Sequence, residues 1–537
     1  MYASPLRARA QALTAEAPKR LGTIESLAKA MTSWRTAAVS LLSFSSGLPL
    51  GLVWIAIPDW MRSSGMDIRV VGLISLTQAP WTFKVLWAPL LDRYVPPWLG
   101  RRRGWAAIAQ IALFALLLAL AGLGDHPDAP WVLMAVTLSI AFASATQDIA
   151  IDAYAVEILR PEEQGVAVGA RVAIYRAAMY VAGGLAITLA ARWSWPAVNV
   201  GLALLFLPML IVTWKAPEPE RVGAPPRTLR EAVWHPFLGF LAKHRALEIL
   251  AFVILYKLSD NLASALLRPF LFDMGYTAFD RGLAVATVGL ALTLLGTFLG
   301  GAMTTSWGLG HCLWLFGFLQ IFAHVGYILL TGIAPNRPLM YAAVGFESLT
   351  QGLGTGAFSV LLLRMTQKRF SATQYSLFSS LFSLPRIVSG PICGFAVAAV
   401  GWRAFFWMAI ASGVPGLLLL QRFAPLGTRD PSIDAAPRVR ASRQLRRGEL
   451  ALSGISAGLA AAVASALLIA FTVAATAARK APDHAFDFGA ALASLTHPAS
   501  AQDWTAVVGV ILTGAVTGLL TAAVRAVRSG AANELGE

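Results

Sequence analysis

Apolar segments of about twenty residues recur along nearly the whole chain, and each could cross a ~30 Å hydrocarbon core as a helix. Short polar connections separate them. The pattern predicts fourteen membrane-spanning helices, at residues 36–58, 70–91, 105–124, 131–152, 165–190, 194–214, 246–270, 282–305, 312–334, 339–363, 372–399, 404–421, 450–478 and 504–524. We therefore expect an all-α integral membrane protein.

Two longer polar connections divide these spans into blocks of six, six and two. The predicted organisation is an N-terminal segment (1–35), a six-helix half (36–214), a linker (215–245), a second six-helix half (246–421), a basic loop (422–449), two additional helices (450–528) and a tail (529–537). The division predicts twelve core helices with two extra helices at the C-terminal end.

A weak internal repeat supports the division into two halves. Tyr175 and Arg176 in span five have their counterparts in Pro385 and Arg386 in span eleven, 210 residues further on. Gly65 and Gly275, which follow spans one and seven, have the same separation. Parallel six-span repeats are typical of the major facilitator fold, in which a central cavity lies between the halves.

Composition and charge agree with a membrane protein. Hydrophobic residues make up 57% of the chain, charged residues only 13%, and the mean hydropathy is +0.64. The net charge of +15 comes mainly from connections on the side that holds both termini. This is the positive-inside pattern, so we expect cytoplasmic termini and a lipid bilayer as partner, with no nucleic acid. Cys312 and Cys393 fall at or inside spans and are expected to be packing residues.

Two carboxylates interrupt the fourth span. Asp148 and Asp152 follow Gln147 and lie four residues apart, which places both on one helical face. A carboxylate at mid-bilayer costs ~2.5–3.5 kcal/mol, so a stacked pair indicates a polar pathway through the protein. In span ten, Glu347 and Gln351 have the same spacing.

Such acids suit proton coupling, because a carboxylate removed from water holds a proton more readily and can load and release it. The proton-coupling candidates are Asp148, Asp152 and Glu347. The alternative is that each acid forms a permanent salt bridge with a cation on a neighbouring helix, with Arg171, Arg176 and Arg386 as the possible partners.

Further polar residues within spans are candidates for a substrate cavity. They are Lys84, Gln147, Arg171, Tyr175, Arg176, Lys257, Asp260, Asn261, Gln351 and Arg386. Lys257 and Asn261 share a helical stripe with Asp260 adjacent, so a polar strip facing the substrate is one interpretation. A local ion pair between Lys257 and Asp260 is the other. The aromatic residues Trp54 and Trp81 are among those able to stack on sugar rings, although such residues also commonly face lipid.

The connection after span two carries a recognisable charge pattern. It runs from Trp87 to Tyr94 and continues through Gly100 to Gly104. It resembles the signature loop of the major facilitator superfamily, in which an acid at a helix end and following basic residues hold one transport state closed. The resemblance implies a conformational latch at Asp92, Arg93, Arg101, Arg102 and Arg103. This chain departs from the family pattern at Ala88, where the family has Gly. The alternative is a basic loop that only sets the orientation of the chain in the membrane. The corresponding connection in the second half, at 305–311, lacks the pattern, so we expect a one-sided latch.

Within that superfamily the chain resembles the AmpG family of muropeptide permeases. The resemblance rests on four runs, from Phe44 to Leu50, Phe83 to Tyr94, Gly100 to Trp105 and Gln147 to Tyr154. It implies a monomeric permease of the bacterial inner membrane. Such a permease imports N-acetylglucosamine linked to anhydro-N-acetylmuramyl peptides for peptidoglycan recycling, using protons. Organellar acetyl-CoA transporters have a similar acid motif, so acetyl-CoA, a sugar or a drug remains an alternative cargo.

An integral membrane transferase is the alternative from another functional class. Of the seven His residues, only His324 lies well inside a span. The chain has no HExxH motif, no nucleophile elbow and no carboxylate-rich metal cluster. We therefore expect a transporter that is not an enzyme and that uses no cofactor and no metal.

Overall fold

The computed structural model describes residues 32–66, 74–124, 130–219, 226, 228–241, 245–431, 445, 447–480, 486–499 and 501–528. Helices joined by turns and bends make up this part of the chain. The chain divides into two compact units. Unit 1 comprises Met1–Ala232 and Glu248–Ser432, and unit 2 comprises Val233–Leu247 and Ile433–Glu537. The N-terminal segment and the tail of the predicted organisation fall almost wholly outside the described residues.

The first half of unit 1 is built from the elements that the first six predicted spans form. They are α3 (Trp34–Gly51), η1 (Leu52–Ala56), α4 (Ile57–Ser63), η2 (Ile74–Gln78), α6 (Ala79–Phe83), η3 (Lys84–Leu86), α7 (Ala88–Arg93), α8 (Arg101–Ala121), α9 (Pro130–Ile158), α10 (Pro161–Tyr180), η4 (Val181–Leu185), α11 (Ala186–Ala190), α12 (Trp195–Leu204) and α13 (Phe206–Lys215).

The second half of unit 1 follows helix α14 (Leu229–Leu241), which the division between the two units cuts. Its elements are α15 (Ala246–Leu255), α16 (Leu258–Ala265), α17 (Leu267–Asp273), α18 (Ala278–Gly282), η5 (Leu283–Gly289), α19 (Leu290–Trp307), α20 (Leu309–Leu330), α21 (Arg337–Met365), η6 (Lys368–Phe370) and α22 (Ser371–Phe423). Helix α22 contains two predicted spans, which meet at Gly401, where φ is 75°.

Local sequence explains where several of these helices begin. Helices α10, α12 and α21 each have a proline in the first turn, where the missing N–H costs nothing. The Ser194 side chain caps α12 by accepting from the N–H of Ala197, and the Asn336 side chain caps α21 by accepting from Leu339. Turn chemistry thus reinforces the boundaries that hydropathy predicts.

The second predicted span, 70–91, is a broken one. Its described part consists of η2, α6, η3 and α7, with Pro80 opening α6 and Pro89 opening α7. A proline cannot continue the hydrogen-bond ladder of a preceding turn, so the span changes direction at these points. Lys84 lies in the middle of the break, where its buried side chain is directed inward.

Among the described residues, eleven helices are long and apolar enough to cross a membrane. The other three predicted spans are 70–91, 339–363 and 372–399. The first is the broken span, the second is α21, which carries Glu347, and the third is the first part of α22. The first does not count because its described part consists of short helices, and all three contribute residues to the cavity described below.

The predicted repeat has a structural counterpart. Gly65 and Gly275 both adopt the left-handed conformation, with φ values of 82° and 83°, at equivalent turns after the first helix of each half. Each half also has its own apolar core, one around Trp60 and Phe206 and the other around Phe270 and Phe406. The halves are therefore two similar bundles within unit 1.

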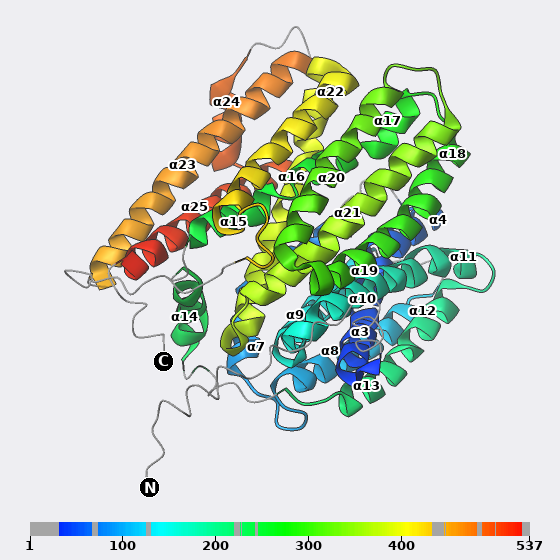
Figure 1. Ribbon diagram of the computed structural model, residues 1–537, viewed down its shortest axis with the longest axis vertical. Coiled ribbons are helices and arrows are strands. Elements are labelled where there is room, and N and C mark those ends of the chain that lie inside the picture. The colour runs from blue at the N-terminus through cyan, green and yellow to red at the C-terminus, as the bar shows by residue number, and fades with distance from the viewer. Residues whose placement is uncertain are drawn as a thin grey trace. The chain divides into compact units, whose positions relative to one another are not determined.

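Helices α10 and α19 bring the two halves into close contact (Figure 1). A Cβ atom on Gly301 would lie 2.7 Å from the Cα of Gly169, and a Cβ on Gly165 would lie 2.5 Å from the Gly301 carbonyl oxygen. Glycine at these positions lets the two backbones approach more closely than any side chain would permit.

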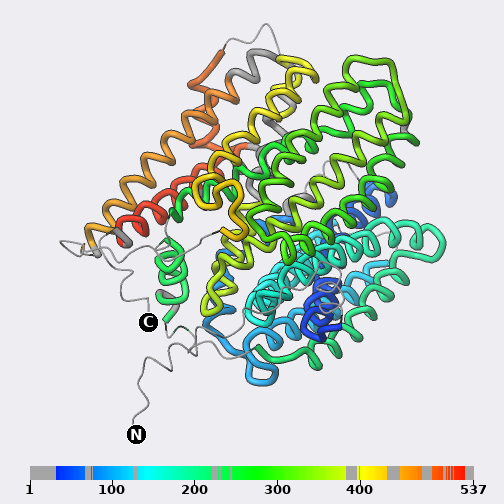
Figure 2. Tube along the Cα trace, viewed as in Figure 1, coloured from blue at the N-terminus to red at the C-terminus, as the bar shows by residue number. Residues whose placement is uncertain are grey.

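Unit 2 contains the long helices α23 (Arg447–Lys480) and α25 (Ala501–Arg528), joined through α24 (Phe488–Thr496). The two long helices lie against each other, as the orange and red segments of Figure 2 show. Gly454 and Gly458 of α23 face Gly514 and Gly518 of α25. The pair is held by the close backbone approach that small residues allow in membranes.

Candidate substrate cavity and latch

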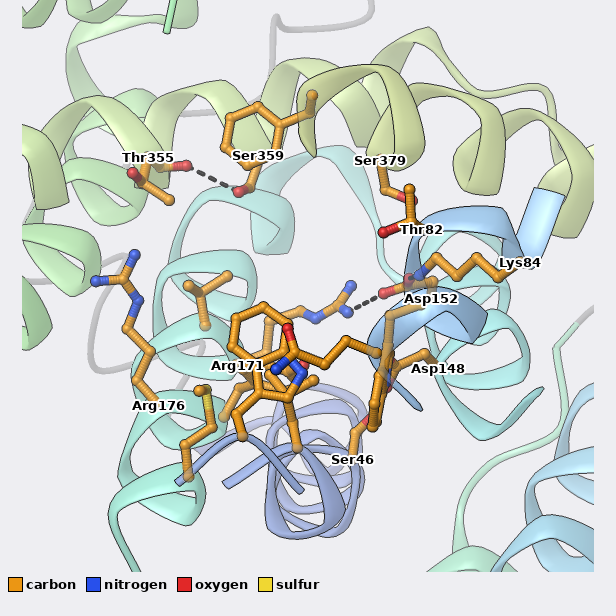
Figure 3. Close-up of a pocket in the computed structure, with 18 of the residues that line it drawn as sticks. Ser46, Thr82, Lys84, Asp148, Asp152, Arg171, Arg176, Thr355, Ser359 and Ser379 are labelled. Atoms are coloured by element: carbon orange, nitrogen blue, oxygen red, sulfur yellow. Dashed lines mark hydrogen bonds and ion pairs between the residues drawn. The ribbon is translucent and has the colours of Figure 1, made fainter. Parts of the chain in front are cut away.

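A cavity with a volume of about 970 Å³ lies in unit 1 between the two halves. Its first wall comes from α3, η1, α6, η3, α9 and α10, and its second wall from α21 and α22, with Leu290 of α19. Figure 3 shows the polar side chains of both walls directed into it. The structure thus has a cavity between the two halves, where the sequence predicts one.

Asp152 is the centre of a buried ion-pair network on the first wall. Its Oδ2 lies 3.1 Å from the Nζ of Lys84, and its Oδ1 accepts from a guanidinium N–H of Arg171. These three side chains come from α9, η3 and α10 and are each between 8% and 12% exposed. Two cations therefore face one carboxylate, and the triad retains an excess positive charge beside the cavity (Figure 3).

Asp148 also lines the cavity but has a different environment. It accepts a hydrogen bond from the hydroxyl of Ser46 on α3, and it has no ion pair among the described residues. Gln147, the preceding residue, points away from the cavity and donates to the hydroxyl of Ser45 at 2.5 Å. The permanent salt bridge is thus present at Asp152 and lacking at Asp148, although one turn separates them.

The remaining predicted residues on the cavity wall are Tyr175, Arg176 and Gln351. Arg386 lies in α22, in a stretch whose side chains are outside the described part of the structure. Sequence reasoning missed several polar residues of the second wall, which are Thr355, Ser359, Tyr375 and Ser379. Serine, threonine and tyrosine are common in membrane helices, so their presence in a span does not indicate that they face a cavity.

Lys257 belongs to a second polar cluster, inside the second half. Its Nζ lies 2.8 Å from Asp260 and 2.6 Å from the side-chain oxygen of Gln320, and it donates to the Gln351 carbonyl at 3.3 Å. The Asn261 side chain donates to the Lys257 carbonyl. Lys257 and Asp260 thus form the predicted local ion pair. The cluster lies behind the second wall of the cavity, and Gln351 is the one residue that belongs to both the cluster and the described lining of the cavity.

Glu347 is buried close to this cluster. Its side chain is near the hydroxyls of Tyr327 and Ser348, the latter at 3.5 Å, and it has no ion pair among the described residues. His324 lies nearby, with its Nδ1 3.3 Å from the Ser259 hydroxyl. In this conformation Glu347 does not reach the cavity wall.

Asp92, the acid of the predicted latch, binds the first turn of α22 in the other half. Its carboxylate accepts from the backbone N–H groups of Ala372 and Thr373, at 3.3 and 2.9 Å, and from the Thr373 hydroxyl at 2.7 Å. An acid at a helix N-terminus satisfies unpaired N–H groups and interacts favourably with the helix dipole.

Arg102 completes this contact and is almost fully buried. Its guanidinium lies 2.6 Å from Asp92 and 2.8 Å from Glu157 at the end of α9, and it donates to the Ser371 hydroxyl. Ser371 in turn donates to Glu157 at 2.6 Å. We call the end of unit 1 where Asp92, Glu157 and Ser371 meet the latch end, and there the two halves are bound together.

The other predicted latch residues have different partners. Arg101 pairs with Glu157, within its own half. Arg103 pairs with Glu218 and donates to the Ala216 carbonyl, which anchors the chain after α13. Arg93 lies over the ring of Tyr94. Of the five residues predicted for the latch, Asp92 and Arg102 contact the other half in the structure, whereas Arg93, Arg101 and Arg103 contact residues of their own half or of the chain that follows it.

A thinner contact is formed by the second half at the same end. Arg364, in the last turn of α21, donates to the side chain of Gln164 at the start of α10 and pairs with Asp430. Gln164 and Gln374 occupy equivalent positions in α10 and α22, 210 residues apart. Each half therefore contacts the first turn of the equivalent helix in the other half, α22 or α10. Among the described residues, only the first half makes this contact through a carboxylate.

Within the described residues, no group of three His, Cys, Asp or Glu side chains is arranged to hold a metal ion. Cys312 and Cys393 are both buried and unpaired with each other. The polar lining of the cavity is suited to ionic and hydrogen-bonding recognition.

Comparison with known proteins shows which family this chain resembles. The model of the Major Facilitator Superfamily matches residues 39–390. The chain is 40% identical over 388 residues to the anhydromuropeptide permease of Escherichia coli K12, covering 72% of this chain and 79% of that one. It is 28% identical over 405 residues to a putative transporter, AmpG 4, of Rickettsia felis, covering 73% and 97%.

Among solved structures, the human organic anion transporter MFSD10 superimposes with a TM-score of 0.56 at 13% identity. The superposition covers 72% of this chain and 99% of that transporter. At this identity the likeness supports the fold alone.

Proposed function

The chain belongs to the Major Facilitator Superfamily and, within it, to the AmpG family of muropeptide permeases, and from this membership we propose that it imports anhydromuropeptides from the periplasm to the cytoplasm. The family and fold make it a multi-pass membrane transporter and not an enzyme. The proposed location is the bacterial inner membrane, with both termini cytoplasmic and a single chain as the transport unit.

The observation that carries the cargo assignment is the cavity between the halves, with its excess of cations. Lys84, Arg171 and Arg176 line it together with Asp148 and Asp152. A muropeptide has peptide carboxylates, which suit guanidinium and ammonium groups, and sugar hydroxyls and amides, which suit serine, threonine and tyrosine side chains. A purely hydrophobic drug would make no use of this polar wall.

Alternating access provides the mechanism. The positive-inside pattern favours a cytoplasmic position for the latch end, which contains Arg101, Arg102 and Arg103. The contacts of Asp92 and Arg102 with α22 then close the cytoplasmic side and leave the cavity to be loaded from the periplasm. Cargo and protons would compensate the loss of these contacts, and rocking of the two halves would open the latch.

Proton coupling is assigned first to Asp148. Asp152 is held ionised by Lys84 and Arg171, which makes it a poor proton carrier and a good organiser of the charged wall. Asp148 lines the cavity without an ion pair, so it can be protonated from the open side and deprotonated after the halves have moved. Glu347, also without an ion pair, is the second candidate and lies farther from the cavity.

Uptake of labelled anhydromuropeptide tests the assignment. Gram-negative cells that lack their own permease would express this chain, with an empty vector and Asp152→Asn as controls, and would be assayed with and without a protonophore. We expect accumulation that the protonophore abolishes. If the chain reaches the membrane and no uptake is seen, the cargo assignment is wrong, and acetyl-CoA, sugars and drugs are the next cargoes to assay.

A further inference from the structure

The wall of the cavity changes its chemistry along its length. Near the latch end it carries Asp152, Arg171 and Tyr375, whereas farther away it carries Trp54, Trp81, Met179 and Tyr180. One end is therefore charged and the other is aromatic. A cargo that fills the whole cavity must have two chemically different parts.

Helix geometry gives the order of these groups. Helix α3 begins at the latch end, because Ser33 at its start donates to Glu163 in the first turn of α10. Ser46 lies at the level of Asp148, to which it is hydrogen-bonded. Trp54 is eight residues farther along the same continuous helix, about 12 Å beyond Ser46 at 1.5 Å per residue. The aromatic end is thus the end that is remote from the latch.

Trp54 and Trp81 form a corner. Their ring centroids are 6.5 Å apart and their planes are perpendicular, at 89°. The rings come from η1 and α6, so two different helices hold them, and both are only partly buried. Two perpendicular aromatic surfaces can contact the face and the edge of one saturated ring together.

Both indoles have an unsatisfied donor. The Nε1 atoms of Trp54 and Trp81 are buried, and no residue in the described part of the chain accepts a hydrogen bond from either. A buried N–H without a partner is costly, and a phenylalanine or leucine would fill the same space without that cost. Donors left unpaired in one transport state are suited to an acceptor that arrives with the cargo or with the movement of the helices.

We propose that the Trp54–Trp81 corner is a subsite for a sugar ring of the cargo, and that the cargo binds with its peptide carboxylates directed toward Arg171 and Arg176. A pyranose presents C–H groups on its faces and hydroxyl or acetamido oxygens at its rim. The C–H faces match the indole rings, and the rim oxygens match the indole N–H groups once movement of the helices uncovers these buried atoms. This inference rests on the proposed function, since it assigns the two parts of a muropeptide to the two ends of one cavity.

The test compares two cargoes in the uptake assay, the disaccharide without peptide and the same disaccharide with its peptide. The variants are Trp54→Leu and Trp81→Leu at the aromatic end and Arg176→Gln, which lies between the two ends, after Arg171 and one turn before Met179 on α10. Trp131→Leu is the matched control, because Trp131 is 67% exposed near the start of α9 and does not line the cavity. Membrane levels and thermal stability of each variant are measured in parallel.

We expect each Trp→Leu change to raise the KM for both cargoes on the order of tenfold, the factor that corresponds to about 1.4 kcal/mol of lost contact. Arg176→Gln should raise the KM for the peptide-bearing cargo alone, and Trp131→Leu should change neither. If a Leu variant fails to reach the membrane, Trp54→Phe and Trp81→Phe replace it in the assay. These variants keep an aromatic ring and remove the N–H group. A higher KM for both cargoes in the Phe variants supports the subsite.

Two outcomes overturn the proposal. The first is that the Trp54 and Trp81 variants behave like Trp131→Leu. The second is a reversed pattern, in which the Trp variants affect only the peptide-bearing cargo and Arg176→Gln affects the bare disaccharide. If the unmodified protein transports neither cargo, the proposed function itself fails, and this result is distinguishable from both.

Discussion

The first half of unit 1 places one buried ion-pair cluster on the cavity wall, whereas the second half encloses its corresponding cluster behind the wall. Lys84, Asp152 and Arg171 form ion pairs that border the cavity. Lys257 and Asp260 form an ion pair of similar length that does not. The two bundles are related by a repeat, so the difference lies in the chemistry that each bundle presents to the cavity and not in its architecture.

The same contrast holds at the latch end and for the unpaired acids. Asp92 binds the first turn of α22 through its carboxylate, while Arg364 reaches α10 through the side chain of Gln164. Asp148 faces the cavity and Glu347 does not. Two halves that share a fold thus contribute different chemistry to one cavity, charged groups from the first half and mainly hydroxyl groups from the second.

Replacing the acid of each ion-pair cluster should have the largest effect. Asp152→Asn leaves Lys84 and Arg171 without their carboxylate, and breaking a buried pair of this kind typically costs ~3–5 kcal/mol. We expect uptake at background and a lower melting temperature of the purified protein. Asp260→Asn leaves the more deeply buried Lys257 without its counter-ion, so it should lower the melting temperature by a similar amount, but it should retain measurable uptake because the pair does not border the cavity. Equal uptake by the two variants would contradict the division between the halves.

Replacing the acids that have no ion pair among the described residues should impair transport without lowering the stability of the protein. Asp148→Asn removes a charge that no ion pair holds, and the amide oxygen can still accept from Ser46. We expect it to abolish protonophore-sensitive accumulation while leaving insertion and melting temperature unchanged, and to preserve exchange of labelled for unlabelled cargo in liposomes. Glu347→Gln should reduce accumulation without abolishing it. Normal accumulation by Asp148→Asn would remove Asp148 from the mechanism.

The latch contacts should give the smallest effect of the three. Asp92→Asn removes the charge at the N-terminus of α22, an interaction worth up to ~2 kcal/mol. It also removes one of the two carboxylates bound to Arg102, but Arg102 keeps its ion pair with Glu157 at 2.8 Å, so no buried cation is left unpaired. We expect uptake to fall on the order of tenfold, the effect of ~1.4 kcal/mol, and Arg364→Gln to cost only a few-fold.

The accessibility of the cavity measures the latch directly. A cysteine introduced at Ser359, in a background with Cys312 and Cys393 replaced by alanine, would be labelled from the cytoplasmic face in inside-out vesicles. Labelling should increase more for Asp92→Asn than for Arg364→Gln. Equal labelling in both variants would mean that the two contacts hold the halves together equally.

Much of the architecture could be predicted from hydropathy, because a membrane span must satisfy its backbone internally and expose apolar side chains. The spans were predicted in this way, whereas the repeat and the family were predicted from short motifs. The signature loop also indicated Asp92 and Arg102 as a latch. The loop could not indicate Ser371 and Thr373, which lie about 280 residues away and carry no distinctive pattern.

The candidate site was predicted less completely. Spacing correctly paired Lys257 with Asp260 as one of two interpretations, but it left open whether the pair faces the substrate. Spacing alone also treated Asp148 and Asp152 alike, since both lie on one face of α9. The structure distinguishes them through Ser46, Lys84 and Arg171, which come from three other segments.

The sequence by itself therefore determined that this protein is a helical membrane transporter of a known family, because the length, polarity and motifs of each segment are local properties. Only the tertiary structure decided which carboxylate is paired, which cluster borders the cavity and which helix the latch binds. Each of these depends on contacts between segments far apart in the chain. The free energy of a buried charge is set by the neighbours that packing brings to it, and not by its own position in the sequence.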